Sequence, residues 1–109
     1  MNDQQFHIKV DALFLQIEQW LETADTFLDF ETEQGILTIF LEKGGQIILS
    51  RQAPLKEIWL ATPQGAYHFR YEGQWQTKQG QLLITTLQES IKQEAEIDLD
   101  PAHFKNEEM

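Results

Sequence analysis

The sequence contains no cysteine among its 109 residues. This absence excludes disulfides, thiolate nucleophiles, cysteine-ligated zinc sites and cysteine-ligated iron–sulfur clusters. Basic residues are also scarce, because 8 lysines and arginines stand against 18 aspartates and glutamates, which gives a formal net charge of −10 with histidine neutral. A chain of this charge repels a phosphate backbone, so we expect cations or basic protein surfaces as partners and no nucleic acid.

Long apolar runs are absent as well. The longest are residues 12–15 and 58–61, which are far too short to cross a lipid bilayer. The first residues, MNDQQFHIK, lack the apolar stretch of a secretion signal. We therefore expect no contact with membranes and a cytoplasmic location.

The length predicts one domain over residues 1–109. Residues 98–109 form a polar C-terminal tail, in which only Leu99 and Phe104 could dock on a core.

Two segments have helical spacing. Apolar residues recur at steps of three and four over residues 6–24, without proline or glycine, which predicts an amphipathic helix that Asn2 or Asp3 can cap. Residues 82–97 have the same spacing and predict a second helix.

The segment between these helices has the alternating pattern of strands, separated by turn signals. The expected strands are residues 28–33, 36–41, 46–51, 56–62 and 66–71, and a short last strand that begins at Gly73 and carries Trp75. Each helix must bury its apolar side, and a one-sided antiparallel sheet provides the surface. The predicted fold class is α+β, a two-layer α/β sandwich with the N- and C-terminal helices packed on one face of a five- to six-stranded antiparallel sheet. The other face is left to solvent or to a partner.

Acidic side chains form a band along the first helix, where they project within about 100° of one another at roughly 100° per residue. The band consists of Asp3, His7, Asp11, Glu18, Glu22 and Asp25, and Asp29, Glu31 and Glu33 continue it on the first strand.

One interpretation of this band is a solvated face that keeps the protein soluble. Two features favour a bound positive partner instead. No lysine or arginine follows Glu18 or Glu22 by three or four residues, and Glu22 and Asp25 lie near the helix C-terminus, where the helix dipole disfavours negative charge. Carboxylates suit Fe²⁺, Mn²⁺, Mg²⁺ or Ca²⁺, and His7 adds a nitrogen ligand that iron accepts. Binding should be weak and exchangeable.

Catalytic residues are not grouped in this sequence. The three histidines are dispersed, and neither a nucleophile motif nor a phosphate-binding glycine loop is present. His68 is expected on the sheet surface, because no acid is placed near it to orient it as a base. A di-iron oxidase or storage site would need Glu-x-x-His pairs on bundled helices, which this chain lacks. We therefore expect no enzymatic activity.

The central segment SRQAPLKEIWLATP, residues 50–63, is followed by GAYHF at residues 65–69 and by Trp75. It resembles the central strands of the frataxin family, and in particular its bacterial CyaY branch. The helix–sheet–helix order and the acidic first helix agree up to about residue 97. The resemblance implies a small sandwich that binds Fe²⁺ and Fe³⁺ weakly at its surface, where other divalent cations can substitute. It also implies binding to the cysteine desulfurase of iron–sulfur cluster assembly, with or near the scaffold protein.

Carried over by position, the resemblance implies an acidic ridge that binds metal. The acidic ridge consists of Asp3, His7, Asp11, Glu18, Glu22, Asp25, Asp29 and Glu31. The residues expected to bind the protein partner are Glu18, Glu22 and Asp25 of the ridge, with Arg51, Gln52 and Trp59 on the sheet surface.

The three tryptophans are expected to differ. If Ile58 and Leu60 face the helices, alternation places Trp59 on the open face of the sheet. Trp20 and Trp75 are expected to pack in the core.

The leading hypothesis is a non-catalytic, iron-binding regulator of iron–sulfur cluster assembly. The alternative is an acidic protein-interaction domain that uses no metal. We expect a monomer, and the sequence leaves open whether it oligomerises with iron, whether it inhibits or activates assembly, and whether it donates or senses iron.

Overall fold

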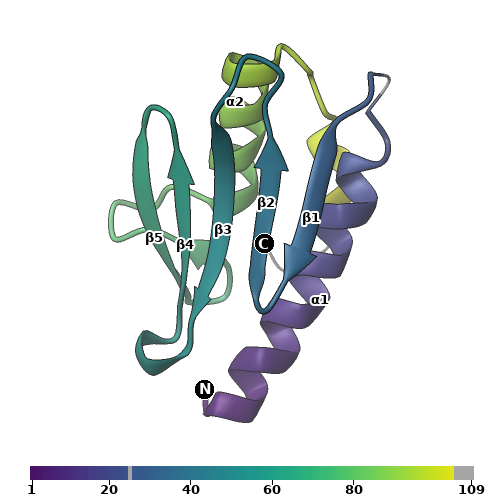
Figure 1. Cartoon of the computed structure of the whole chain (residues 1–109). Coiled ribbons are helices and arrows are strands. Elements are labelled where there is room, and N and C mark those ends of the chain that lie inside the picture. The colour runs from purple at the N-terminus through teal and green to yellow at the C-terminus, as the bar shows by residue number, and fades with distance from the viewer. Residues whose placement is uncertain (25, 105–109) are drawn as a thin grey trace.

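A computed structural model describes residues 1–24 and 26–104 (Figure 1). In chain order the elements are α1 (Asp3–Leu21), β1 (Asp29–Glu33), β2 (Ile36–Phe40), β3 (Gln46–Gln52), the 3₁₀ turn η1 (Ala53–Leu55), β4 (Glu57–Thr62), β5 (Gly65–Tyr71), β6 (Trp75–Gln76), α2 (Leu83–Ala95) and the 3₁₀ turn η2 (Pro101–Phe104). The predicted order of helix, sheet and helix is confirmed.

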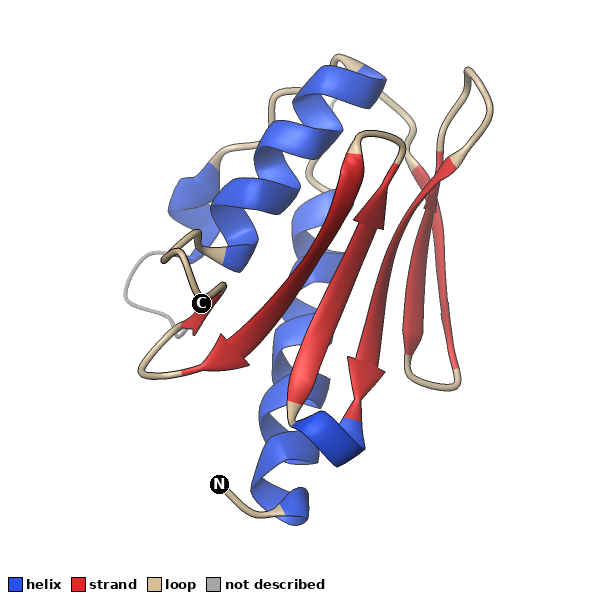
Figure 2. Ribbon diagram, turned by 90° about the vertical axis from the view of Figure 1, so that its left-hand side faces the viewer, coloured by secondary structure: helices blue, strands red, loops and turns tan. Residues whose placement is uncertain are grey.

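The six strands form one antiparallel sheet in the order β1-β2-β3-β4-β5-β6, so each strand pairs with its neighbour in the chain. Both helices lie against the same face of this sheet, and the opposite face is open (Figure 2). The predicted α+β sandwich is therefore confirmed.

The core lies between the helices and the sheet. Alternate residues of the central strands point into it, and Leu49, Ile58 and Leu60 have no exposed surface. Trp20 and Trp75 are also buried, as predicted. Burial of these apolar side chains supplies the main driving force for folding.

Several boundaries differ from the predicted ones for local reasons. Helix α1 begins at Asp3 because Asn2 caps it: the Asn2 side chain accepts from the Gln5 backbone N–H at 2.8 Å, and the Gln5 side chain accepts from the Asn2 backbone N–H at 2.9 Å. Helix α2 stops at Ala95 because Glu96 adopts a left-handed conformation with φ 57°. Lys56 does the same with φ 55°, so β4 begins one residue later than predicted.

The segment after α2 is tied to the core. Leu99 and Phe104 are buried, as predicted for the two apolar residues of the tail. The Trp20 indole N–H donates to the Asp100 carbonyl at 2.8 Å, and the Phe104 ring packs edge-on against Trp20 with centroids 5.0 Å apart. Residues 105–109 of the predicted tail lie outside the described residues.

No helix within residues 1–24 and 26–104 is both long enough and apolar enough to span a lipid bilayer.

Candidate functional site

The N-terminal half of the acidic ridge is partnered by basic residues from β3 and from the turn between β3 and β4. Asp3 forms an ion pair with Lys56, and Asp11 accepts a hydrogen bond from Arg51. The hydrogen bond from Lys56, together with its positive charge, lowers the pKa of Asp3 below its usual value. The expectation of an uncompensated acidic band is therefore wrong for these two carboxylates, because residues distant in sequence neutralise them.

Arg51 lies on the helix-facing side of β3. One terminal nitrogen, Nη1, donates to His7 Nδ1 at 2.9 Å, and the other, Nη2, donates to Asp11 Oδ1 at 2.5 Å. Its guanidinium carbon also lies 5.7 Å from the Phe14 ring centroid. The predicted place of Arg51 on the open sheet surface is therefore wrong. Successive residues of a strand point to opposite faces, so Arg51 and Gln52 cannot share one.

Gly35 makes room for the Arg51 side chain. It follows Gln34 in the tight turn between β1 and β2, where the two residues have φ 80° and 52°. A Cβ atom at Gly35 would lie 3.1 Å from Arg51 Nε. Glycine therefore satisfies both the turn conformation and the close approach of Arg51.

The C-terminal half of the ridge on α1 has a different environment. Glu18 accepts a hydrogen bond from the Thr32 hydroxyl of β1, and Glu22 is the C-cap of α1. Neither carboxylate forms an ion pair with another described residue. Asp25, the next predicted member, lies outside the described residues. Among the described ridge carboxylates of α1, Glu18 and Glu22 are therefore the ones whose charge no ion pair offsets.

The acids of β1 do not lie on the same side as those of α1. Phe30 and Thr32 pair with the buried residues Ile39 and Leu37, so they face the helix layer. The alternate residues Asp29 and Glu31 therefore project from the opposite side of this edge strand. The described members of the ridge are therefore divided between α1 on one side of the sheet and the opposite side of β1.

Among residues 1–24 and 26–104, no three His, Asp or Glu side chains lie close enough together to hold one ion. His7 accepts from Arg51 through Nδ1, so its other nitrogen must carry the hydrogen of the neutral ring. His7 can therefore ligate a metal only if the bond to Arg51 breaks.

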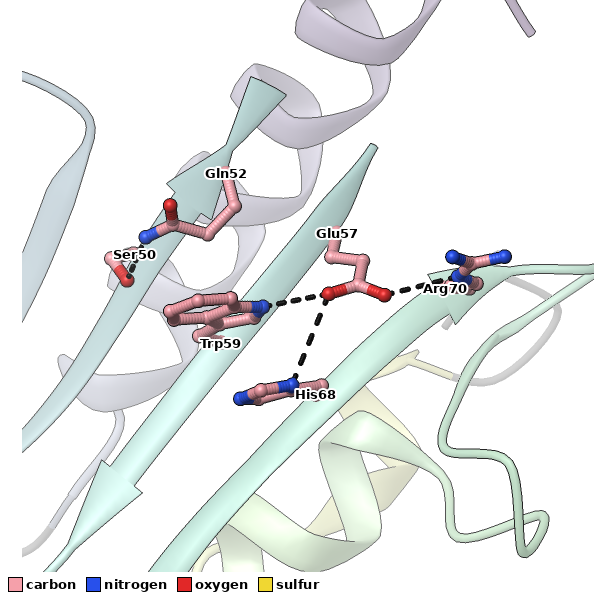
Figure 3. Close-up of polar contacts among 6 residues, drawn as sticks. All are labelled: Ser50, Gln52, Glu57, Trp59, His68 and Arg70. Carbon is pink, nitrogen blue, oxygen red and sulfur yellow. Dashed lines mark hydrogen bonds and ion pairs between the residues drawn. The ribbon is translucent and has the colours of Figure 1, made fainter. Parts of the chain in front are cut away.

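Gln52 and Trp59 lie on the open face of the sheet, as predicted. Gln52 donates to the Ser50 hydroxyl at 3.2 Å, and Trp59 is half-buried while its neighbours Ile58 and Leu60 are fully buried (Figure 3). Trp59 is thus accessible on the face opposite α1 and α2 (Figure 2).

Glu57, which sequence reasoning missed, organises this surface. Its Oε1 accepts from the Trp59 indole N–H at 2.8 Å, and its Oε2 accepts from Arg70 Nε at 3.0 Å. His68 Nδ1 lies 3.9 Å from Oε1, and the His68 ring stacks on Trp59 with centroids 4.2 Å apart and an angle of 7° between the planes (Figure 3). We call Glu57, Trp59, His68 and Arg70 the Trp59 cluster.

The expectation for His68 was correct in one part and wrong in another. His68 is exposed on the sheet surface, as predicted, but an acid does lie beside it. One signal for Glu57 was present in the sequence, since it stands two residues before Trp59 and so shares its face. Its pairing with Arg70 depends on the register between β4 and β5.

The charge of Glu57 makes stability depend on pH. Burial acts to raise the pKa of Glu57, but hydrogen bonds from Trp59 and Arg70, with the nearby positive charge, outweigh it and lower the pKa below its ordinary value of 4.5. A depressed pKa stabilises the fold above pH 4.5, and that stability is lost as the pH falls through the folded-state pKa.

We expect Glu57→Gln to lower the free energy of unfolding by about 1–2 kcal/mol at pH 7, because an acceptor for Arg70 is lost. The difference from the wild-type protein should shrink as the pH falls below 4.5. Urea denaturation at pH 7 and pH 3 measures both values. Glu72→Gln, which removes an exposed acid after β5, is the control and should change stability by less than about 0.5 kcal/mol. A difference that persists unchanged at pH 3 would contradict the assigned charge of Glu57.

Comparisons with known proteins agree with the fold. The family model of the frataxin-like domain matches residues 1–97. A solved structure of frataxin from Psychromonas ingrahamii, studied as a model of stability within the CyaY protein family, has 30% sequence identity and a TM-score of 0.85, with 92% of this chain and 97% of that chain covered. Yeast frataxin has 27% identity and a TM-score of 0.60, with 84% of this chain and 77% of that chain covered.

Proposed function

Since this chain belongs to the frataxin-like domain family, we propose that it is a non-catalytic, iron-binding regulator of iron–sulfur cluster assembly. Family membership supports the general role in cluster assembly. The finer proposal is that the acidic ridge binds Fe²⁺ or Fe³⁺ weakly and also binds a basic surface of the cysteine desulfurase. Gln52 and Trp59 would provide a second contact, to the desulfurase or the scaffold protein.

The observation that carries this proposal is the unequal neutralisation of the ridge. Asp3 and Asp11 have internal partners, whereas Glu18 and Glu22 form no ion pair with a described residue. Glu22 also lies at the C-terminal end of α1, where the helix dipole makes negative charge unfavourable. An external cation or a basic protein surface would supply the missing positive charge and would offset the unfavourable interaction of Glu22 with the helix dipole. The docking site is therefore assigned to the Glu18–Glu22 half of the ridge.

Reversing charge at this half should weaken desulfurase binding. We expect the Glu18→Lys/Glu22→Lys variant to bind about tenfold less tightly at low salt, because two favourable charge contacts become repulsive. The loss should shrink as ionic strength screens the charges. Calorimetry with purified desulfurase at low and moderate salt measures both effects.

The matched control is the Glu42→Lys/Glu89→Lys variant, which makes the same change in net charge at exposed acids of the β2–β3 turn and of α2. It should retain most of the wild-type affinity. Equal losses in the two variants would show that only net charge matters. Affinity that is indifferent to both salt and Glu18→Lys/Glu22→Lys would exclude the ridge as the docking surface.

Iron binding is tested separately by an anaerobic NMR titration with Fe²⁺. Paramagnetic broadening should begin at Glu18, Glu22 and Thr32 and reach Asp3 and Asp11 only at higher iron, because Lys56 and Arg51 already neutralise those carboxylates. The Glu18→Lys/Glu22→Lys variant should lose the early phase.

Broadening spread evenly over exposed acids, including Glu89 of α2, would contradict a ridge site. Absence of broadening would favour the alternative function, an acidic protein-interaction domain without metal. If both ligands use the ridge, Fe²⁺ should also reduce desulfurase affinity, since a bound cation neutralises the charge that attracts a basic protein.

A further inference from the structure

Glu57 is a carboxylate with no part in the proposed metal site or partner contact. It is only 8% exposed although it lies on the open face of the sheet, opposite the face against which α1 and α2 pack (Figure 2). Removing a charged group from water is costly unless hydrogen bonds replace its hydration. The low exposure of Glu57 therefore indicates a role other than keeping the surface soluble.

Both oxygens of Glu57 are occupied by donors from its own surface. Oε1 accepts from the Trp59 indole at 2.8 Å and Oε2 from Arg70 at 3.0 Å. Glu57 and Arg70 are direct cross-strand partners, and so are Trp59 and His68. The pairing of β4 with β5 thus places all four side chains of the Trp59 cluster on one patch (Figure 3).

These contacts restrict the Trp59 ring in two directions. The hydrogen bond to Glu57 fixes the edge of the indole that carries N–H, and the stack on His68, with planes 7° apart, fixes one face. A side chain that is already ordered loses less conformational entropy when it enters an interface. Trp59 is only half-buried, so part of its surface remains open to a partner.

We propose that Glu57 is a positioning residue, which holds Trp59 in one orientation and so pre-orders it for binding a protein partner. This inference rests on the proposed role of Trp59 in partner binding. Because Glu57 and Arg70 neutralise each other, the patch fits an apolar or uncharged polar group of the partner. Binding through Trp59 should therefore depend little on salt, in contrast to binding through Glu18 and Glu22.

The first test uses the free protein and measures solvent exchange of the Trp59 indole N–H by NMR. The signal is assigned as the one missing in Trp59→Phe, and the buried indoles of Trp20 and Trp75 are internal references. In Glu57→Ala the Trp59 N–H should exchange at least about tenfold faster, because it loses its acceptor. Glu57→Gln should largely restore slow exchange, since its carbonyl oxygen can still accept. Glu72→Ala is the control and should leave exchange unchanged.

The second test measures desulfurase affinity for Glu57→Ala, Trp59→Phe and the double variant. Glu57→Ala should weaken binding about threefold to tenfold, and the double variant should be no weaker than the weaker single variant. Unchanged indole exchange in Glu57→Ala would overturn the inference whatever the binding result. The inference would also be overturned if Glu57→Ala kept wild-type affinity for the desulfurase while Trp59→Phe bound weakly. If exchange accelerates but neither single variant loses affinity, the role of Trp59 in desulfurase binding is overturned while its positioning by Glu57 is supported.

Discussion

Replacing Phe104 with alanine is expected to lower the free energy of unfolding by about 3–5 kcal/mol, which is a large part of the stability of a domain of this size. Phe104 has no exposed surface, and its ring packs edge-on against Trp20. The deletion leaves a cavity beside the Trp20 indole and loosens the segment that Trp20 holds through Asp100. Urea denaturation followed by circular dichroism measures the loss.

Phe27→Ala is the matched control, since Phe27 is 84% exposed and the same atoms are removed. It should change stability by less than about 0.5 kcal/mol. If Phe104→Ala is as stable as Phe27→Ala, residues 98–104 do not pack on the core in solution, and the tail is only the polar extension that its composition suggests.

Arg51→Ala is expected to lower the free energy of unfolding by about 2–3 kcal/mol and, at the same time, to raise the affinity for Fe²⁺. Stability falls because two hydrogen bonds between β3 and α1 are lost together with the packing of the arginine stem against Gly35. Iron affinity should rise about fivefold at low salt, because Asp11 loses its internal cation and His7 becomes free to ligate. Denaturation and an anaerobic Fe²⁺ titration measure the two effects.

Lys78→Ala removes one positive charge from the exposed loop after β6 and should change neither quantity appreciably. If Arg51→Ala lowers stability but raises the affinity for Fe²⁺, Arg51 is an internal competitor of bound cations. A parallel fall of both would show that Arg51 instead supports the metal site.

Strand alternation accounts for the face on which Arg51 lies, which differs from the expected one, and for the face of Glu57, a residue that sequence reasoning missed. Neighbours on a strand point to opposite faces, so Arg51 cannot share a face with Gln52. Residues two positions apart share a face, so Glu57 lies on the same side as Trp59. Strict use of alternation would have placed both residues correctly, but it would not have identified Asp11 or Arg70 as their partners.

Register explains why those partners needed the structure. The turn between β4 and β5 was predicted to include Gly65, whereas Thr62 pairs with Gly65 and only Pro63 and Gln64 form the loop. A one-residue difference in the loop shifts every cross-strand pair. The stack of His68 on Trp59 therefore depends on a turn that composition alone places only approximately.

By itself, the sequence determined the elements, their order and the side that each buries, because the periods of 3.6 and 2 are local properties of a few neighbouring residues. Only the tertiary structure decided which charges of the ridge are neutralised, because Arg51 and Asp11 are 40 positions apart in the chain. Their meeting depends on how α1 crosses the sheet, which is set by the packing of the whole core. The same packing left Glu18 and Glu22 without ion-pair partners among the described residues.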